Sequence, residues 1–329
     1  MRAWTRPHRG PASNLQLTTL PTPAIPPTSS ADVLVRISHV ALTFNTELLM
    51  TLIPNTPLTR PWIPEIEFSG QVVAAGANAP AELRDPGTHV IGFQSILGYA
   101  TGLGVLAEYI DGAVDMAAAA GINGAGSCAL KICRRAGVRE GHVVLVNGAS
   151  GSVGSVVVQL CKVRGARVVA VASGGNEEMV RGLGADEFID YRKHDPLPDY
   201  LTSQYGDKPF DFVLDCVGTQ ALYANSPAYL KPEGAVINIG FLEGIVKTTI
   251  NVLANQFLPT WLGGVPRRYI TFSTPPDRDA AVYMARLVEE GRIRIPVDSV
   301  FDMEDVVGAY ERVATKRARG KVVIKVQRD

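Results

Sequence analysis

The chain has 329 residues, of which 46% are hydrophobic and 19% are charged, and its formal net charge is zero. This length and composition predict a substantial buried core in two domains or one large elaborated domain, and they exclude a disordered chain. Because the chain is neutral and has no long basic run, bulk charge gives no reason to expect nucleic acid or an anionic membrane as a partner.

The first third of the chain predicts a β-rich, barrel-like unit. Prolines crowd residues 21–27, which indicates an extended loop. Strands are predicted over residues 33–40, 71–75 and 89–93, and a short helix over residues 45–50. Short strands between frequent glycine and proline turns are typical of such a unit.

After this region the pattern changes to strands that alternate with helices. Continuous apolar strands alternating with helices indicate a parallel sheet covered on both faces, with right-handed crossovers. The predicted helices are 113–120, 126–136, 152–163 and 177–183, and the predicted strands are 143–146, 168–172, 188–189, 212–214 and 235–239. The tail adds strands over 269–272 and 322–326 and helices over 279–290 and 303–315.

The N-terminus and the cysteines favour a cytoplasmic protein. Prolines and polar residues interrupt the first residues, unlike a secretory signal, and no apolar run approaches the length of a membrane span. Cys128, Cys133, Cys161 and Cys216 lie in apolar or helical contexts without the spacing of a disulfide framework. They are expected to be free thiols in a reducing compartment.

A glycine-rich motif directly follows the strand over residues 143–146. The sequence reads NGASGSVG over residues 147–154, which from Ala149 is Ala-x-Gly-x-x-Gly. Small residues let the backbone approach a pyrophosphate, the following helix offers free N–H groups, and Gly154 lets this helix pack on the strand. Strand, glycine turn and helix in this order are the context that a dinucleotide-binding fingerprint requires. A tight turn without a ligand is the alternative.

The end of the next strand favours NADPH over NADH. An enzyme that uses NAD usually carries Asp or Glu there, about 20 residues after the loop, to bind the ribose 2′-hydroxyl. Residues 172–176 read ASGGN without an acid, and Ser173 and Asn176 are able to donate hydrogen bonds to a 2′-phosphate. Tyr191 and the Arg-Lys pair after it can add a phenol and positive charge, although a solvated turn explains the two charges equally well.

The histidines, cysteines and acids do not predict a zinc site. No Cys-x-x-Cys occurs, and none of the five histidines is paired with a cysteine at ligand spacing. Glu47, Glu65 and Glu67 fit loop acids or a domain-interface ion pair better than metal ligands. Since no nucleophile motif is present either, we expect neither catalytic nor structural zinc, and the cofactor supplies the chemistry.

Short motifs along nearly the whole chain carry a family resemblance. Residues 65–72 are similar to Gly-x-Asp-x-x-Gly-x-Val, with Glu65 at the first glycine and Glu67 at the acid. The others are a strand and Ala-Leu-Asn-Pro-x-Asp turn (31–50), Gly-Asp-x-Val-x-Gly (87–92), Ala-Glu-Tyr (107–109), Leu-Gly-Ala-Asp (183–186), Asp-x-x-Gly (215–218) and Gly-Lys-x-Val (320–323). In this order they resemble the medium-chain dehydrogenase/reductase superfamily, most closely its zinc-free quinone oxidoreductase and enoyl reductase branch.

The resemblance implies an α/β protein with two domains. One is a GroES-like β-rich catalytic domain of residues 1–117 and 276–329, and the other is a Rossmann domain, a doubly wound parallel sheet, of residues 118–275. The active site is expected in the cleft between them. With Gly154 of the glycine loop, the expected cofactor contacts are Ser127, Gly151, Ser152, Val153, Ser173, Asn176, Tyr191, Val217, Gly240, Phe241 and Lys321. A homodimer joined by edge strands near residues 268–272 is suggested, and a monomer with this edge capped stays open.

One departure from the family pattern concerns the nicotinamide side. The Asn-Pro pair of the family is Thr43-Phe44 here, Glu47 stands one place later than the expected acid, and residues 48–53 contain no tyrosine. Thr43 and Tyr99 are therefore the candidate catalytic donors. Plain packing roles for both and protonation by solvent are the alternatives.

These observations predict an NADPH-dependent, zinc-free oxidoreductase. Its reaction is hydride transfer to an activated C=C bond of an enone or enoyl group, including polyketide-type substrates, or to a quinone. The substrate is expected to be an apolar conjugated small molecule. The alternatives are a carbonyl or alcohol oxidoreductase, and a cofactor-binding biosynthetic or regulatory protein without redox turnover.

Overall fold

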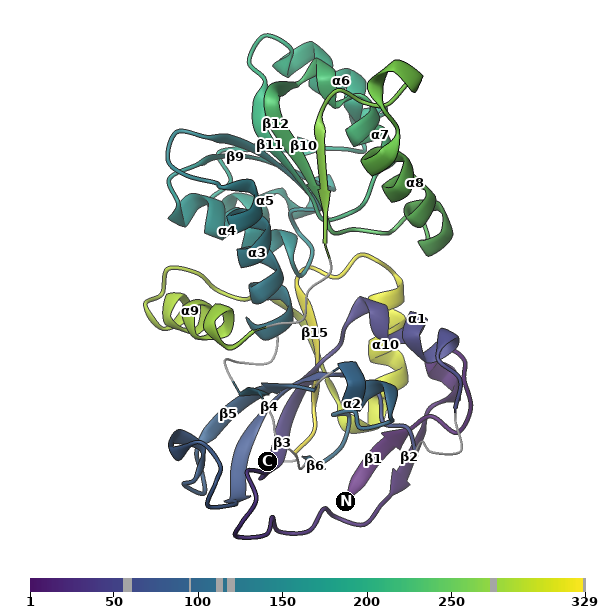
Figure 1. The fold of residues 1–329 in the computed structure, drawn as a ribbon, viewed down its shortest axis with the longest axis vertical. Coiled ribbons are helices and arrows are strands. Elements are labelled where there is room, and N and C mark those ends of the chain that lie inside the picture. Colours follow the sequence, from purple (N-terminus) through teal and green to yellow (C-terminus); the bar gives the residue numbers. More distant parts are fainter. Residues whose placement is uncertain (56–60, 95, 111–114, 117–121, 273–276, 328–329) are drawn as a thin grey trace. The chain divides into compact units, whose positions relative to one another are not determined.

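Two compact units make up the chain. The computed structural model describes residues 1–55, 61–94, 96–110, 115–116, 122–272 and 277–327. Unit 1 comprises Met1–Ser127, Pro275–Gly291 and Ile295–Asp329, and unit 2 comprises Cys128–Thr274 with Arg292–Arg294. The division thus falls after Ser127, where the sequence prediction had residue 117, and both chain ends contribute to unit 1 (Figure 1).

Unit 2 is built on a six-stranded parallel sheet with the order β10-β9-β8-β11-β12-β13. The chain enters in the middle at β8, moves outward to β10, and returns to build the other half from β11. The strands are β8 Val143–Asn147, β9 Arg167–Ala172, β10 Glu187–Asp190, β11 Phe210–Asp215, β12 Leu230–Asn238 and β13 Arg268–Thr271. The helices are α3 Ser127–Ala136, α4 Gly154–Val163, α5 Glu177–Gly182, α6 Leu197–Tyr205, α7 Gln220–Ala224 and α8 Ile245–Phe257.

Helices cover both faces of this sheet, because successive strand residues point to opposite sides. Leu145 of β8 lies in one buried cluster with Leu201 of α6 and Leu222 of α7. Helix α4 contacts β8 and β9 instead, and Figure 1 shows α4 and α7 on opposite sides of the strands. The predicted doubly wound sheet is confirmed.

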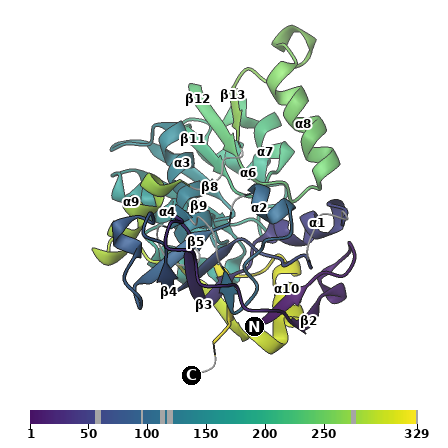
Figure 2. The same ribbon diagram turned by 60° about the horizontal axis from the view of Figure 1, so that its bottom comes forward.

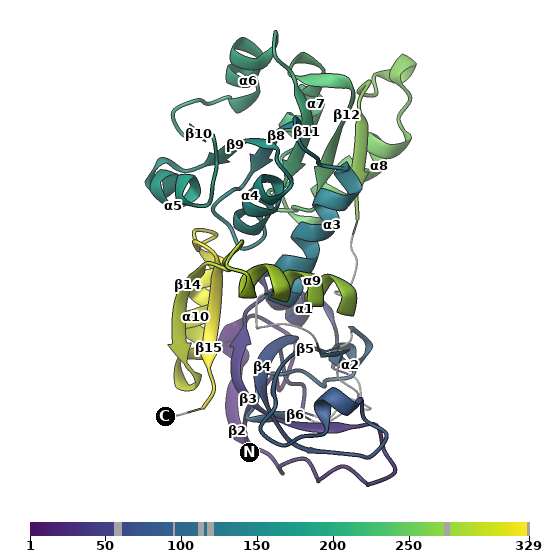
Figure 3. The same ribbon diagram turned by 90° about the vertical axis from the view of Figure 1, so that its left-hand side faces the viewer.

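Unit 1 contains a second, mainly antiparallel sheet with the order β14-β15-β3-β4-β5-β7, and β6 pairs with β3. The strands of this sheet are β3 Val33–Ala41, β4 Glu67–Ala75, β5 His89–Phe93, β6 Tyr109–Ile110, β7 Asp115–Met116, β14 Val297–Asp302 and β15 Lys321–Lys325, and a separate two-stranded sheet joins β1 Arg2–Thr5 to β2 Gln16–Thr19. Its helices are α1 Phe44–Leu52, α2 Ile96–Ala100, the π-helix Ile122–Gly126, α9 Arg278–Glu289 and α10 Val306–Ala314. Figure 3 shows α10 beside β14 and β15, all from the C-terminal part of the chain.

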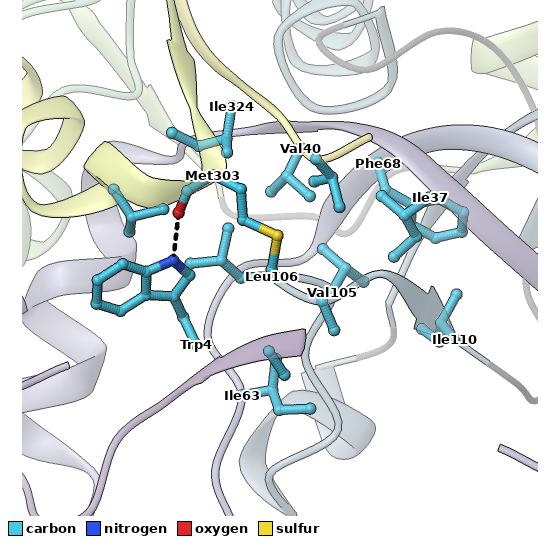
Figure 4. Close-up of a cluster of buried hydrophobic side chains, with 14 of the residues drawn as sticks. Trp4, Ile37, Val40, Ile63, Phe68, Val105, Leu106, Ile110, Met303 and Ile324 are labelled. Carbon is cyan, nitrogen blue, oxygen red and sulfur yellow. Dashed lines mark hydrogen bonds between the residues drawn. The ribbon is translucent and has the colours of Figure 1, made fainter. Parts of the chain in front are cut away.

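The core of unit 1 joins residues from both chain ends. The indole Nε1 of Trp4 donates a buried 2.6 Å hydrogen bond to the backbone oxygen of Met303 (Figure 4). Around this pair lie Ile37, Phe68 and Ile324, from β3, β4 and β15, each without exposed surface. Because a buried indole N–H needs an acceptor, this hydrogen bond favours one packing arrangement of the N-terminal strand against the C-terminal segment.

Some elements differ from the sequence predictions. The helix predicted over residues 113–120 is wrong at residues 115–116, which form β7 against β5, and the rest of it lies outside the described residues. There the strand pairing overrides the helical preference of an alanine-rich stretch. Helix α8 was not predicted at all: none of its residues is buried, and it lies beside β13 (Figure 2). No helix in the described part of the chain is long and apolar enough to cross a membrane.

Candidate functional site

The glycine loop has the geometry of a phosphate cradle. Strand β8 ends at Asn147, and Gly148 then takes a left-handed backbone with φ 78°. A Cβ at Gly154 would lie 2.1 Å from the backbone oxygen of Gly148, so only glycine allows α4 to begin so close to the strand end. No side chain caps α4, whose N-cap is Val153. The N–H groups of Ser155 and Val156 already donate to the backbone oxygens of Gly151 and Val153, so the N–H groups that can meet an anion are those of the turn before them, residues 152–154.

Asn176 connects this loop to the end of β9. Its Nδ2 donates to the hydroxyl oxygen of Ser150 at 2.9 Å and to that of Ser173 at 3.1 Å. The Asn176 side chain is 9% exposed, so its amide hydrogens are committed to these two bonds. The Ser150 and Ser173 hydroxyls then keep their own hydrogens for an acceptor. The two serine hydroxyls, positioned by the asparagine, are thus the groups of this turn that can donate to a ligand.

The end of β10 lies beside the same turn. A Cβ at Gly174 would lie 2.4 Å from Oδ2 of Asp190, and Oδ1 of Asp190 accepts from the backbone N–H of Arg192 at 3.1 Å. Tyr191 is 43% exposed, and the Arg192 guanidinium lies 5.8 Å from its ring centroid. A phenol and a cation therefore stand at the outer side of the turn, where they are free to meet a ligand.

The ends of β11 and β12 complete this edge of the sheet. Oδ1 of the buried Asp215 accepts from the backbone N–H groups of Val217 and Gly218, at 2.9 and 3.0 Å, which fixes the loop after β11. Burial raises the pKa of Asp215, and these donors oppose the rise. A Cβ at Gly240 would lie 2.1 Å from the carbonyl carbon of Val217, so the two loops pack backbone against backbone. Phe241 follows directly.

The predicted cofactor residues of unit 2 therefore share one location. Gly151 to Gly154, Ser173, Asn176, Val217, Gly240 and Phe241 follow β8, β9, β11 and β12, which are neighbouring parallel strands. The strand order reverses between β8 and β11, and dinucleotides bind at such switch points. Tyr191 follows β10 at the same edge. Ser127 and Lys321, the remaining predicted contacts, belong to unit 1.

Lys321 has a protein partner inside unit 1. Its Nζ lies 3.0 Å from Oε2 of Glu67, and the two side chains are 6% and 3% exposed. A Cβ at Gly124 would lie 1.7 Å from Oε1 of the same carboxylate, so the backbone of the π-helix passes directly over it. Glu67 is thus in an ion pair with the Lys321 ammonium, inside unit 1 and on a strand, whereas the sequence favoured a loop acid or a domain-interface pair.

Several buried polar atoms of unit 1 have no hydrogen-bond partner. Among the described residues of this unit they are the hydroxyls Thr43 Oγ1, Tyr99 Oη and Ser127 Oγ, together with Arg6 Nε and Trp62 Nε1. Tyr99 is 2% exposed, and its ring meets that of Trp62 edge-on at 4.6 Å between centroids. Burial raises the pKa of Tyr99 and keeps its phenol neutral. Because an unpartnered buried hydroxyl is costly, these groups are suited to a ligand atom.

Sequence reasoning missed one residue of this region, Tyr310 on α10, and interpreted Glu65 as a loop acid or a member of a domain-interface ion pair. The Glu65 carboxyl has no exposed surface and accepts from Tyr310 Oη at 2.6 Å. Its backbone φ is 65°, in the left-handed region. The glycine that the family pattern places at this position was a signal for that conformation, whereas nothing in the sequence pointed to Tyr310.

The two units together define a class of protein. A doubly wound sheet with a glycine-rich phosphate cradle, next in the chain to a β-rich unit built from both ends, is the architecture of two-domain dinucleotide-binding oxidoreductases. Comparisons with known proteins agree. A family model for zinc-binding dehydrogenases matches residues 183–324.

The medium chain reductase pydE of an Acremonium species is 45% identical over 99% of this chain and 99% of its own length. The trans-enoyl reductase poxH of Penicillium oxalicum is 31% identical over 100% of this chain and 98% of its own. A solved quinone oxidoreductase from Coxiella burnetii shares the fold, with a TM-score of 0.80 and 24% identity over 99% of both chains. The chain belongs to the medium-chain dehydrogenase/reductase superfamily, in the quinone oxidoreductase and enoyl reductase branch, and it is an oxidoreductase.

The zinc in the description of the family model does not fit these residues. The described part of the chain contains no group of three or more His, Cys, Asp or Glu side chains that could hold a metal ion. All four cysteines lie in unit 2. Glu67, the acid of the family segment, is bound to the Lys321 ammonium. We therefore derive no step through a metal.

Proposed function

We propose that the protein reduces an activated carbon–carbon double bond of an enone or enoyl group, or a quinone, with NADPH. When bound, NADPH supplies the hydride, which adds to the β-carbon, while a proton adds to the α-carbon of the resulting enolate. The names of two relatives, a medium chain reductase and a trans-enoyl reductase, support this reaction. The substrate class is an apolar conjugated small molecule, to which polyketide-type enones belong.

The observation that carries the choice of NADPH is the Asn176 bridge. It holds the Ser150 and Ser173 hydroxyls at the end of β9, where an NAD enzyme usually places a carboxylate. Two hydroxyl donors favour the dianionic 2′-phosphate, and the exposed Arg192 adds charge. The carboxylate of Asp190 disfavours a 2′-phosphate, but its Oδ1 already accepts a hydrogen bond from the backbone N–H of Arg192.

The catalytic donors in this proposal are Thr43 and Tyr99. A hydride addition to an enone places negative charge on the carbonyl oxygen, and preorganised donors stabilise such charge. The unpartnered hydroxyls of Thr43 and Tyr99 offer two donors for it without a metal. We retain Ser127 and Lys321 as proposed cofactor contacts. The hydroxyl of Ser127 is also unpartnered.

The test is a titration of the full chain with NADPH and NADH, followed by a panel of enones, enoyl thioesters and quinones. We expect tighter binding of NADPH and oxidation that depends on the acceptor. Tyr99→Phe and Thr43→Val should lower kcat on the order of 10²-fold each if they serve the oxyanion, with the Kd of NADPH unchanged. NADPH binding without oxidation by any acceptor would contradict the reductase assignment, and no binding at all would contradict the role of the glycine loop.

A further inference from the structure

Helix α8 turns its apolar residues toward solvent. Val246, Ile250, Leu253 and Phe257 are between 53% and 74% exposed, and none of the residues of α8 is buried. Their spacing of four, three and four positions places them on one stripe of the helix, about 16 Å long. A surface helix of a globular protein normally packs such a stripe on the core, so an exposed stripe indicates a surface that meets an apolar partner.

The opposite side of α8 is polar and faces the rest of unit 2. Asn255 and Gln220 exchange two amide hydrogen bonds, at 2.8 and 2.9 Å. One turn earlier, Asn251 Nδ2 donates to Glu243 Oε2 at 3.4 Å, and Thr248 lines a polar cavity at the ends of β11 and β12. A rotation of the helix that buries the stripe would break these bonds. The fold therefore holds the apolar stripe outward.

Exposed apolar residues continue beyond the end of α8. Trp261 and Leu262 lie in the turn Thr260–Leu262 and are 80% and 56% exposed. A backbone hydrogen bond from Gly263 to Thr260 closes this turn. An exposed indole combines an apolar ring with one N–H donor, which suits the boundary between lipid headgroups and acyl chains. The stripe and this turn together are called the α8 surface.

The chain around this surface is basic, although the net charge of the whole chain is zero. Residues 244–272 contain Lys247, Arg267 and Arg268 but no Asp or Glu. Lys247 is paired with Glu243, which precedes the segment. Arg267 donates to backbone oxygens and Arg268 is exposed, so within the described residues neither is paired with a carboxylate. Apolar side chains beside unpaired cations match lipid tails beneath anionic headgroups.

Shape and charge favour a lipid bilayer over other occupants of the α8 surface. Small molecules bind in concave sites, whereas the stripe lies on a convex helix. A second copy that packed stripe against stripe would bring a second set of cations without an acid in the same segment. A bilayer needs no complementary groove and offers both lipid tails and anionic groups. Strand pairing at the β13 edge leaves this surface open, because it extends the sheet in its own plane, whereas the stripe points away from the sheet.

We propose that the α8 surface binds the protein to the face of an anionic lipid bilayer. Phe257 and Trp261 insert at the level between the headgroups and the acyl chains, and Arg268 meets the lipid phosphates. The inference concerns the outer face of unit 2 and does not depend on the reaction proposed above. An apolar substrate partitions into the same bilayer, so this binding would raise its local concentration at the enzyme.

Co-sedimentation with vesicles tests the binding. The full chain is mixed with vesicles of phosphatidylcholine, with and without phosphatidylserine, at low and high salt. We expect binding to the vesicles that contain phosphatidylserine, and weaker binding at high salt, because ions screen the cations. Phe257→Ser and Trp261→Ser should each weaken binding on the order of 10-fold, because an apolar side chain is no longer buried. Arg268→Gln should weaken it about fivefold, the effect of one cation near the surface.

A matched control separates this surface from exposed apolar residues in general. Ile25 is as exposed as Phe257, at 74%, but lies in the proline-rich loop of unit 1, so Ile25→Ser should bind vesicles as the wild type does. The Kd of NADPH should stay constant in all these variants, which shows that they are folded. The fluorescence of the wild type should shift to shorter wavelength on vesicle binding, and Trp261→Phe should lose most of this shift.

The outcomes distinguish the occupants of the α8 surface. No binding of the wild type at low salt overturns the proposal, and so does equal binding of the wild type and the double variant Phe257→Ser/Trp261→Ser. Binding that does not depend on phosphatidylserine overturns the role of the cations. A wild-type dimer that the double variant converts to a monomer, together with no vesicle binding, assigns the surface to a second copy instead.

Discussion

The Lys321 ammonium and the Glu67 carboxylate, 254 positions apart in the sequence, form a buried ion pair with an Nζ–Oε2 distance of 3.0 Å. The pair links β15, from the C-terminal end of the chain, to β4 within unit 1. A buried charge is costly without its partner, so the stability of unit 1 should depend on keeping both Lys321 and Glu67.

Removal of one partner should destabilise unit 1. Lys321→Met leaves the Glu67 charge buried without its cation, and we expect a loss of about 3 kcal/mol in the free energy of unfolding. The double variant Lys321→Met/Glu67→Gln should recover part of this loss, because no unpaired charge remains. Urea unfolding followed by tryptophan fluorescence measures both. Lys247→Met, at an exposed pair with Glu243, is the control and should change stability little. Equal losses in the single and double variants would show that packing, not charge, dominates.

An acid at the end of β9 should reverse the cofactor preference. Ser173→Asp replaces one of the two hydroxyls held by Asn176 with a carboxylate, which repels a 2′-phosphate and can bind a ribose hydroxyl. We expect the Kd of NADPH to rise on the order of 10²-fold and that of NADH to fall or stay constant. Fluorescence titration of the reduced cofactors measures this, with Ser173→Ala as the uncharged control. Parallel weakening of both cofactors would refute the phosphate site.

The pair Asp298–Arg312 should make unit 1 sensitive to acid. Two Arg312 nitrogens lie 2.6 and 2.8 Å from the Asp298 oxygens, and these bonds are the main cause that lowers the pKa of Asp298, to about 2. The native state therefore binds the proton less readily than the unfolded chain, so the contribution is present above about pH 4 and lost toward pH 2.

Asp298→Asn should cost about 1–2 kcal/mol at pH 7, after allowance for screening at the partly exposed Arg312. The difference from the wild type should shrink as the pH falls from about 4 to about 2. Urea unfolding across this range measures it. Glu177→Gln, at the exposed pair with Arg181, should show no comparable effect. A difference that is independent of pH would argue that the charge of Asp298 is not the cause.

We propose a homodimer joined through β13, which is an edge strand of the unit 2 sheet. An open edge strand offers unpaired backbone groups, and the adjoining α8 exposes Val246 and Phe257 at 71% and 74%. Light scattering should give a dimer mass. Thr271→Lys on β13 should give a monomer, because an edge lysine blocks strand pairing, and Thr202→Lys on α6 should not. A monomeric wild type would contradict the proposal.

Local patterns explain what the sequence could predict. The β8 strand, its glycine turn and α4 are contiguous, and each contributes a signal with a known physical cause, so this strand, turn and helix were predicted in the right order, while their role in phosphate binding stays a prediction. Helix α8 was not predicted although its apolar residues, among them Val246, Ile250, Leu253 and Phe257, share one side at helical spacing, so here an available local pattern was overlooked. The pairing of Glu65 with Tyr310, 245 positions apart, depends on the tertiary fold and has no local signature.

The place of β15 in the sheet has a consequence for biosynthesis. This strand pairs with β14 on one side and with β3 on the other, so β3 lacks this partner until residues 321–325 have been made. Most of unit 2, by contrast, is one continuous stretch, Cys128–Thr274, and is able to fold during translation, before β15 is made. In the nascent chain, residues 39–41 of β3 therefore lack their β15 partner while unit 2 folds, and until β15 is made this exposed strand edge can pair with other chains and aggregate.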